Sequence, residues 1–117
     1  MRALKAEEVE FSLTIEDEDI PMDFDSGEPE KDEALKKELR DRLDRGDLWA
    51  WCCVKVTAKW KTWEGVDYLG GCSYDGEEDF KKDGHWEDMK DQALEDLNKK
   101  IASTAESLME LCEREAS

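Results

Sequence analysis

The sequence predicts an α+β fold, a two-layer sandwich in which a three-stranded sheet and two helices follow the order β-α-β-β-α. Two observations carry this prediction. Residues 48–74 alternate apolar and polar side chains in two runs, which is the period-2 pattern of a long β-hairpin. Two other stretches repeat apolar residues every three or four positions, as amphipathic helices do. With 117 residues, the chain is expected to form one domain, residues 1–117, around one core.

The turn of the hairpin sets the register of its two strands. The even positions are apolar in residues 48–60 and again in residues 66–74. A three-residue loop, Trp63-Glu64-Gly65, with Gly65 at positive φ pairs Trp60 with Tyr68 and puts both apolar sets on one face. A two-residue Glu-Gly turn would slip the register by one residue and send one apolar set to the wrong face. We therefore expect the three-residue loop.

A first strand and an acidic segment precede the hairpin. Residues 9–15 alternate apolar with polar side chains, which predicts a strand with one buried face. Residues 16–33 are strongly acidic and are interrupted by Pro21 and Pro29. Two interpretations of this segment stay open. It is either a mobile acidic loop or an ordered loop whose three apolar residues dock on the core, namely Ile20, Met22 and Phe24.

The first helix has a clear start and a clear end. Pro29 suits a first helical turn, and Gly46 suits the position just after a helix C-terminus. Leucines recur every fourth residue in between, so a helix is expected over residues 29–45. After the hairpin, residues 77–82 are expected to form a short helical turn with Phe80 pointing inward.

The longest predicted element is a helix that begins near His85 and spans about 28 residues, on the order of 42 Å. A three-stranded sheet is narrower than this, so the C-terminal turns, residues 108–112, are expected to overhang. These turns either pack over the open end of the sheet or form the seam of a homodimer. The tail, residues 106–117, is expected to fray because its glutamates lie at the negative end of the helix dipole. Gly70 and Gly71 in the hairpin are expected to let a helix or Trp60 come close.

The charge excludes two classes of direct partner. The chain has 33 acidic and 17 basic residues and a formal net charge of -16. Phosphates repel such a surface, which excludes nucleic acid and anionic membranes. No apolar run approaches 18 residues, and the N-terminal residues lack the apolar core of a signal peptide. Together with the absence of a disulfide framework, these features predict a cytoplasmic protein.

The sequence lacks the residue patterns that are typical of common catalytic and cofactor sites. The four cysteines form no C-x-x-C pair and His85 is the only histidine, so we expect no metal site. No glycine-rich phosphate loop and no nucleophile beside a base occur, so we expect no cofactor and no catalytic residue. The sequence therefore predicts a protein that is not an enzyme. An enzyme alternative would use carboxylates with Mg²⁺.

One part of the sequence resembles a known group of proteins. The run WCCVKVTAKW, followed by DYLGGCSYDGEEDF and HWEDMKDQALEDLN, is similar to small, uncharacterised acidic proteins of tailed bacteriophages and prophages. The resemblance covers roughly residues 48–98 and consists of aromatic, glycine and acidic positions. It implies a phage accessory role and transfers no functional residue.

The acidic clusters are the candidate partner-binding residues. A protein that mimics nucleic acid needs dense carboxylates on rigid elements, since B-DNA carries one charge per ~1.7 Å of its axis. Three stretches offer this density, in the first strand and its extension, in the acidic segment, and around the start of the long helix: Glu16, Asp17, Glu18, Asp19, Asp23, Asp25, Glu77, Glu78, Asp79, Glu87 and Asp88. We therefore expect protein binding, with inhibition of a basic nucleic-acid-binding host defence protein as one form of it. The alternative is a structural or assembly accessory protein without an inhibitory role.

Overall fold

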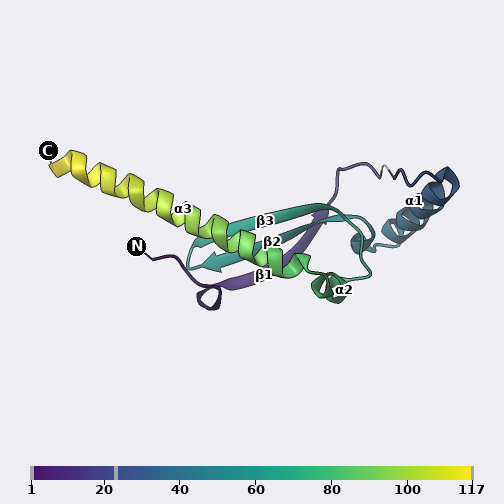
Figure 1. Ribbon diagram of the computed structural model, residues 1–117, viewed down its shortest axis with the longest axis horizontal. Helices are drawn as coiled ribbons and strands as arrows, with labels where there is room; N and C mark the ends of the chain where they lie inside the picture. Colours follow the sequence, from purple (N-terminus) through teal and green to yellow (C-terminus); the bar gives the residue numbers. More distant parts are fainter. Residues whose placement is uncertain (1, 23, 117) are drawn as a thin grey trace. The chain divides into compact units, whose positions relative to one another are not determined.

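Three strands and a long C-terminal helix dominate the computed structural model, which describes residues 2–22 and 24–116 (Figure 1). The strands form one antiparallel sheet in the order β1-β2-β3. The predicted α+β class, element order and long C-terminal helix are confirmed. Along the chain the elements are the short 3-10 helix η1 (Ala6–Glu8), β1 (Glu10–Asp17), α1 (Pro29–Asp44), the 3-10 helix η2 (Leu48–Ala50), β2 (Cys52–Trp60), β3 (Trp63–Cys72), α2 (Glu77–Lys82) and α3 (His85–Ala116).

The described residues divide into two compact units, and every strand contributes to both. The first unit consists of residues 2–12, 56–67 and 87–116, and therefore holds the β2–β3 turn and nearly all of α3. The second unit consists of residues 13–22, 24–55 and 68–86 and holds α1 and α2. That the chain forms one domain stays a prediction.

Burial along β1 and β2 follows the predicted alternation. In β1 every second side chain is half-buried, from Phe11 to Ile15. In β2 the even positions are buried: Cys52, Val54, Val56 and Ala58. The prediction that β2 begins at Leu48 is wrong, because Leu48–Ala50 form η2 and the strand begins at Cys52.

An aromatic cluster in the second unit accounts for this early break. The ring of Trp49 lies 6.4 Å from that of Tyr74 and 5.9 Å from that of Phe80. The Tyr74 backbone N–H also donates to the Trp49 carbonyl oxygen, at 2.9 Å. These contacts take Trp49 out of the strand and into a cluster with α2.

The predicted turn of the hairpin is wrong. Two residues, Lys61 and Thr62, connect β2 to β3, and Lys61 has a positive φ of 56°. Gly65 is not at positive φ, and Tyr68 is 51% exposed, so Trp60 does not pair with Tyr68 on a buried face. The ammonium group of Lys61 lies over the Trp60 ring, 4.7 Å from its centroid, which favours the unusual lysine conformation.

Glycines explain why the buried face of β3 differs from the predicted one. Gly65 is buried, and a Cβ on it would meet the Ala93 carbonyl oxygen and the Leu97 backbone nitrogen of α3. Gly71 has a φ of +65°, which breaks the alternation before the buried Cys72. The close approach between hairpin and helix therefore occurs at Gly65, whereas we predicted it at Gly70 and Gly71.

Helices α1 and α2 lie where the sequence predicts them. α1 begins at Pro29 and ends at Asp44, and Gly46 follows with a φ of +89°. The Gly46 backbone N–H donates to the Leu43 carbonyl oxygen at 2.9 Å, which satisfies a carbonyl at the C-terminal end of α1. α2 buries Phe80 completely, as predicted.

The structure describes the acidic segment before α1 except for Asp23. The prediction that Asp23 binds a partner therefore falls outside the described residues. The ring of Phe24 contacts that of Trp51, edge to face, with centroids 5.7 Å apart. The Trp51 indole N–H donates to the Ile20 carbonyl oxygen at 2.9 Å, although the Ile20 side chain is 52% exposed. The docked interpretation therefore describes Phe24 and the half-buried Met22, while Ile20 lies against Gly70 of β3 and stays about half exposed.

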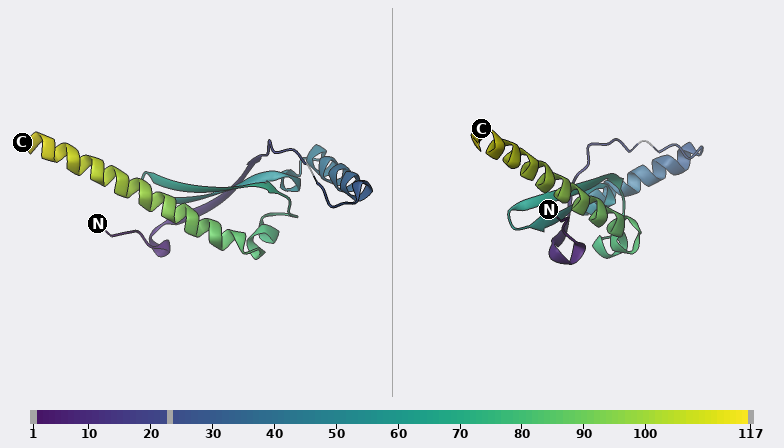
Figure 2. Two further views of the ribbon diagram at one scale, coloured as in Figure 1. Left: turned by 45° about the horizontal axis from the view of Figure 1, so that its top comes forward. Right: turned by 60° about the vertical axis from the view of Figure 1, so that its left-hand side comes forward.

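Helix α3 is longer than predicted, with 32 residues. Its first half buries Met89, Ala93 and Leu97. Its second half continues past the β2–β3 turn, and Figures 1 and 2 show this end without neighbouring elements. The interpretation that it packs over the open end of the sheet is wrong, because Leu108, Met109 and Leu111 are 58%, 65% and 53% exposed. Residues 106–116 are helical, and the expected fraying of this tail stays a prediction.

Candidate functional site

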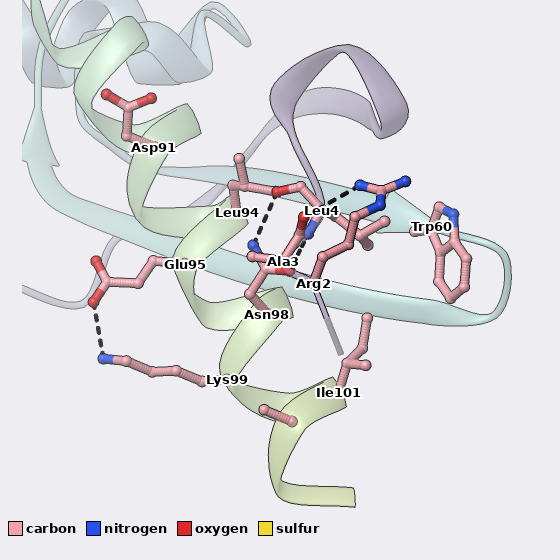
Figure 3. A pocket seen from close by; sticks show the side chains of 11 residues that line it. Arg2, Ala3, Leu4, Trp60, Asp91, Leu94, Glu95, Asn98, Lys99 and Ile101 are labelled. Atoms are coloured by element: carbon pink, nitrogen blue, oxygen red, sulfur yellow. Dashed lines mark hydrogen bonds and ion pairs between the residues drawn. The ribbon is translucent and has the colours of Figure 1, made fainter. Parts of the chain in front are cut away.

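An open groove of about 730 Å³ lies in the first unit, between the N-terminal residues and α3 (Figure 3). The N-terminal wall consists of Arg2, Ala3 and Leu4, and Trp60 lines the groove at the end of β2. The α3 side of the groove is formed by residues that recur every three or four positions: Asp91, Leu94, Glu95, Asn98, Lys99, Ile101 and Ala102. The groove thus combines an apolar floor with charged edges.

The N-terminal wall is attached to α3 by one asparagine side chain. The Leu4 backbone N–H donates to Asn98 Oδ1 at 2.9 Å, and Asn98 Nδ2 donates to the Leu4 carbonyl oxygen at 3.1 Å. This pair of bonds imitates the way two strands pair, and it satisfies both backbone groups of Leu4.

An ion pair folds the same segment back on itself. Both terminal nitrogens of Arg2 donate to the Glu8 carboxylate, at 2.6 and 2.7 Å. These bonds, and a weaker one from the Lys5 backbone N–H, lower the pKa of Glu8 to about 2. The N-terminal wall is therefore held at both ends.

The α3 side is fixed to the hairpin just as firmly. The Val66 backbone N–H donates to the Asp96 carboxylate at 2.9 Å, which lowers the pKa of Asp96. Lys100 Nζ donates to the Glu64 carbonyl oxygen at 3.2 Å. With the close contact at Gly65, these bonds make the first half of α3 a rigid support for the groove.

Among the described residues, the side chains that line the groove are apolar, acidic, basic and amide groups, and no serine, cysteine or histidine is one of them. Glu95 pairs with Lys99 at 3.0 Å, whereas Asp91 makes no ion pair within the described part of the chain. Among the described residues, no group of three or more His, Cys, Asp and Glu is placed to hold a metal ion.

The predicted acidic site residues are spread over both units. Glu16, Asp17, Glu18, Asp19 and Asp25 belong to the second unit, as do Glu77, Glu78 and Asp79 of α2, while Glu87 and Asp88 of α3 belong to the first. The structure therefore describes several separate acidic clusters, and that they form one binding site stays a prediction.

Glu18 has a role within the fold. Its carboxylate accepts hydrogen bonds from the backbone N–H groups of Gly71 and Ile20, at 2.5 and 3.1 Å. These bonds lower the pKa of Glu18, the one to Gly71 most strongly. Its carboxylate attaches the acidic segment to β3, while Glu16, Asp17 and Asp19 beside it are exposed.

A titratable cluster of Tyr74, Asp83 and His85 lies in the second unit. Tyr74 donates its hydroxyl hydrogen to Asp83 at 2.9 Å, and His85 Nε2 lies 4.0 Å from the same carboxylate oxygen. Burial, aided by this bond, raises the pKa of Tyr74 to about 12. Burial likewise raises the pKa of Cys52 to about 12 and of Cys72 to about 11, so these thiols stay protonated near neutral pH.

Sequence reasoning missed the groove because it assigned its residues to the core or to no site. One signal was present, since Asn98 is a polar residue inside the apolar stripe of Leu94, Leu97 and Ile101. A polar residue in such a stripe needs a partner when it is half-buried, and here the partner is the backbone of Leu4.

No helix in the described part of the chain has both the length and the apolar character to cross a membrane.

Comparisons with known proteins do not indicate a function. No protein-family model, curated protein or solved structure matches the chain.

Proposed function

We propose that this chain is a small acidic accessory protein that acts by binding another protein, without catalysis of its own. The observation that carries the proposal is the exposed end of α3. We call its apolar residues, Ala105, Leu108, Met109, Leu111 and Cys112, the tail face. Leu108, Met109 and Leu111 are each more than half exposed, although the helix that carries them is anchored firmly at its other end.

Apolar side chains on one helix face support a binding role better than scattered ones do. Single exposed leucines are common on protein surfaces, but a row of them on one helix marks an interaction site. Burying each large side chain would contribute roughly 1.5–3 kcal/mol. The groove adjoins this row through Ile101 and Ala102, so the two surfaces form one continuous face of α3.

The acidic surface supplies the second element of the proposal. Acidic residues outnumber basic ones in both units, so long-range attraction favours a basic partner and speeds its association. A nucleic-acid-binding host protein is the second candidate partner, and the exposed carboxylates of Glu77, Glu78 and Asp79 on α2 favour it. The resemblance to phage proteins makes bacterial host proteins the natural source of such partners.

The test is capture from a bacterial lysate with the full chain and two matched variants. Leu108→Asp places a charge in the tail face, and Ser103→Asp places the same charge on the opposite side of the same helix segment. We expect Leu108→Asp to lose the captured protein and Ser103→Asp to keep it. Equal capture by both variants contradicts the proposed role of the tail face. Release of the partner by salt and by competing DNA, with Leu108→Asp unaffected, favours the second candidate.

A further inference from the structure

The charges beside the tail face differ between its two sides. On an α-helix, residues 91, 95, 106 and 113 share one side because their spacings are close to whole turns. In this chain all four are acidic: Asp91, Glu95, Glu106 and Glu113. The other side of the apolar face carries hydroxyl groups at Ser103, Thr104 and Ser107. The groove and tail face therefore form an apolar strip with one acidic edge.

The acidic edge has charge that is not neutralised within the fold. Asp91 and Glu106 make no ion pair within the described residues, and both are exposed. Within the described part of the chain, Glu95 pairs with Lys99 on the same helix, an exposed pair of the kind that contributes little to stability. Cationic side chains of a partner would meet open carboxylates along this edge.

A second copy of this chain is a poor occupant of the strip. Between residues 101 and 113 every charged residue is a glutamate. Two copies of this segment side by side would oppose like charges in either orientation, which is destabilising. Each whole chain also carries a formal net charge of -16. Charge complementarity favours a different and basic partner.

We propose that the groove and tail face of α3 together form the docking site for an amphipathic helix of another protein, whose apolar stripe has lysine or arginine along one edge. The inference rests on the proposed function and names its partner chemistry. The strip from Asp91 to Glu113 is about 33 Å long, which matches a helix of about 20 residues. Side chains of that helix enter the groove beside Trp60 and Ile101, which Asp91 also lines (Figure 3). Its cations face Asp91 and Glu106.

The experiment measures binding of synthetic peptides to the full chain by fluorescence anisotropy at low and high salt. The first peptide is a helix of about 20 residues with a leucine stripe and lysines at the other positions. The second replaces every lysine by glutamate, and the third has the composition of the first with the leucines distributed around the helix. We expect the first peptide to bind roughly tenfold more tightly than either of the others.

Protein variants locate the binding. We expect Leu108→Asp to weaken the first peptide roughly tenfold and Ser103→Asp to leave its affinity within about twofold. Asp91→Asn and Glu106→Gln should each weaken it about threefold and reduce its salt dependence. Circular dichroism of each variant checks that α3 remains folded, and shifts of amide signals in residues 101–112 on titration place the peptide directly.

Four results overturn the inference. If the lysine and glutamate peptides bind equally well, the acidic edge does not determine which peptide binds. If the redistributed peptide binds as tightly as the first, the interaction is general charge attraction. Sedimentation equilibrium showing a dimer that Leu108→Asp dissociates would make a second copy the occupant. The fourth result is a lysate protein that loses binding in Leu108→Asp and keeps it in Asp91→Asn. That result would support the proposed function and contradict the basic helix, so the two proposals can be tested separately.

Discussion

The two halves of α3 carry the same apolar periodicity and have opposite environments. In the first half Met89, Ala93 and Leu97 are buried, at 3% exposure or less. In the second half Leu108, Met109 and Leu111 continue the pattern and are each more than half exposed. Apolar periodicity therefore identifies the face of a helix that avoids water, but not the surface that covers it. In the first half that surface is the hairpin, and in the second half we propose a partner.

Substituting one leucine in each half tests this difference most directly. Leu97→Ala should destabilise the protein by about 3 kcal/mol, because it removes buried methyl groups and leaves a cavity. Leu108→Ala should change stability by less than about 0.5 kcal/mol, since its side chain is 58% exposed. Urea unfolding of both variants measures the two values. Equal losses would show that the tail face is already covered in the free protein.

The close contact at Gly65 holds the first half of α3 against β3. Gly65→Ala should destabilise the protein by roughly 1–3 kcal/mol, because a Cβ there would lie 2.7 Å from Leu97 Cα and closer still to other backbone atoms. Gly84→Ala is the matched control, with no atom near its Cβ and no positive φ, and it should be close to neutral. Thermal unfolding compares them. A neutral Gly65→Ala would argue against a close approach of strand and helix.

The elements that sequence predicted correctly have local signals. Pro29 and Gly46 mark the two ends of α1, and their effects act within one helical turn. The period-2 pattern of β2 likewise needs only neighbouring residues, and its even positions from Cys52 to Ala58 are buried as predicted. The short helix α2 and its inward Phe80 follow from the same kind of local pattern.

The turn and the groove depend on contacts that no local pattern shows. A lysine at positive φ is uncommon, and Lys61 has this conformation beside Trp60. Because no glycine stands at this position, the sequence did not indicate where the turn lies. The groove depends on Leu4 and Asn98, which are 94 positions apart in the chain. The acidic clusters were visible in the composition, but composition does not show that Glu18 bonds to the backbone of Gly71.

The Asn98 side chain tests whether the groove has a fixed wall. Asn98→Ala removes both hydrogen bonds to Leu4 and should cost about 1–2 kcal/mol. Asn98→Asp keeps an acceptor for the Leu4 N–H but sets a carboxylate oxygen against the Leu4 carbonyl oxygen in place of the donor, so its effect should be at least as large. Amide hydrogen exchange at Leu4 is the direct measurement. Unchanged protection of that amide in Asn98→Ala would show that the N-terminal wall is held by other contacts.

The smallest expected effect is a pH dependence of the bond between Asp96 and the hairpin. The Val66 backbone N–H, and to a lesser degree Lys100, lowers the folded-state pKa of Asp96 below its ordinary value. A lowered folded-state pKa means that the stabilisation is present above the unfolded pKa, near 3.9, and is lost as pH falls through the folded value. Because the side chain is 36% exposed, we expect a contribution below about 1 kcal/mol at neutral pH.

The measurement is the difference in unfolding free energy between the native chain and Asp96→Asn, taken at neutral pH and again well below pH ~4. The difference should shrink at low pH, since the protonated carboxyl no longer binds the Val66 N–H as an anion. Lys100→Gln serves as the control, because it removes the ion pair and the bond to the Glu64 carbonyl oxygen and leaves the stronger backbone bond of Asp96 in place. A difference that stays constant with pH would assign the attachment of α3 to packing at Gly65. A difference that Lys100→Gln abolishes would assign it to the contacts of Lys100, and not to the bond between Asp96 and the Val66 backbone.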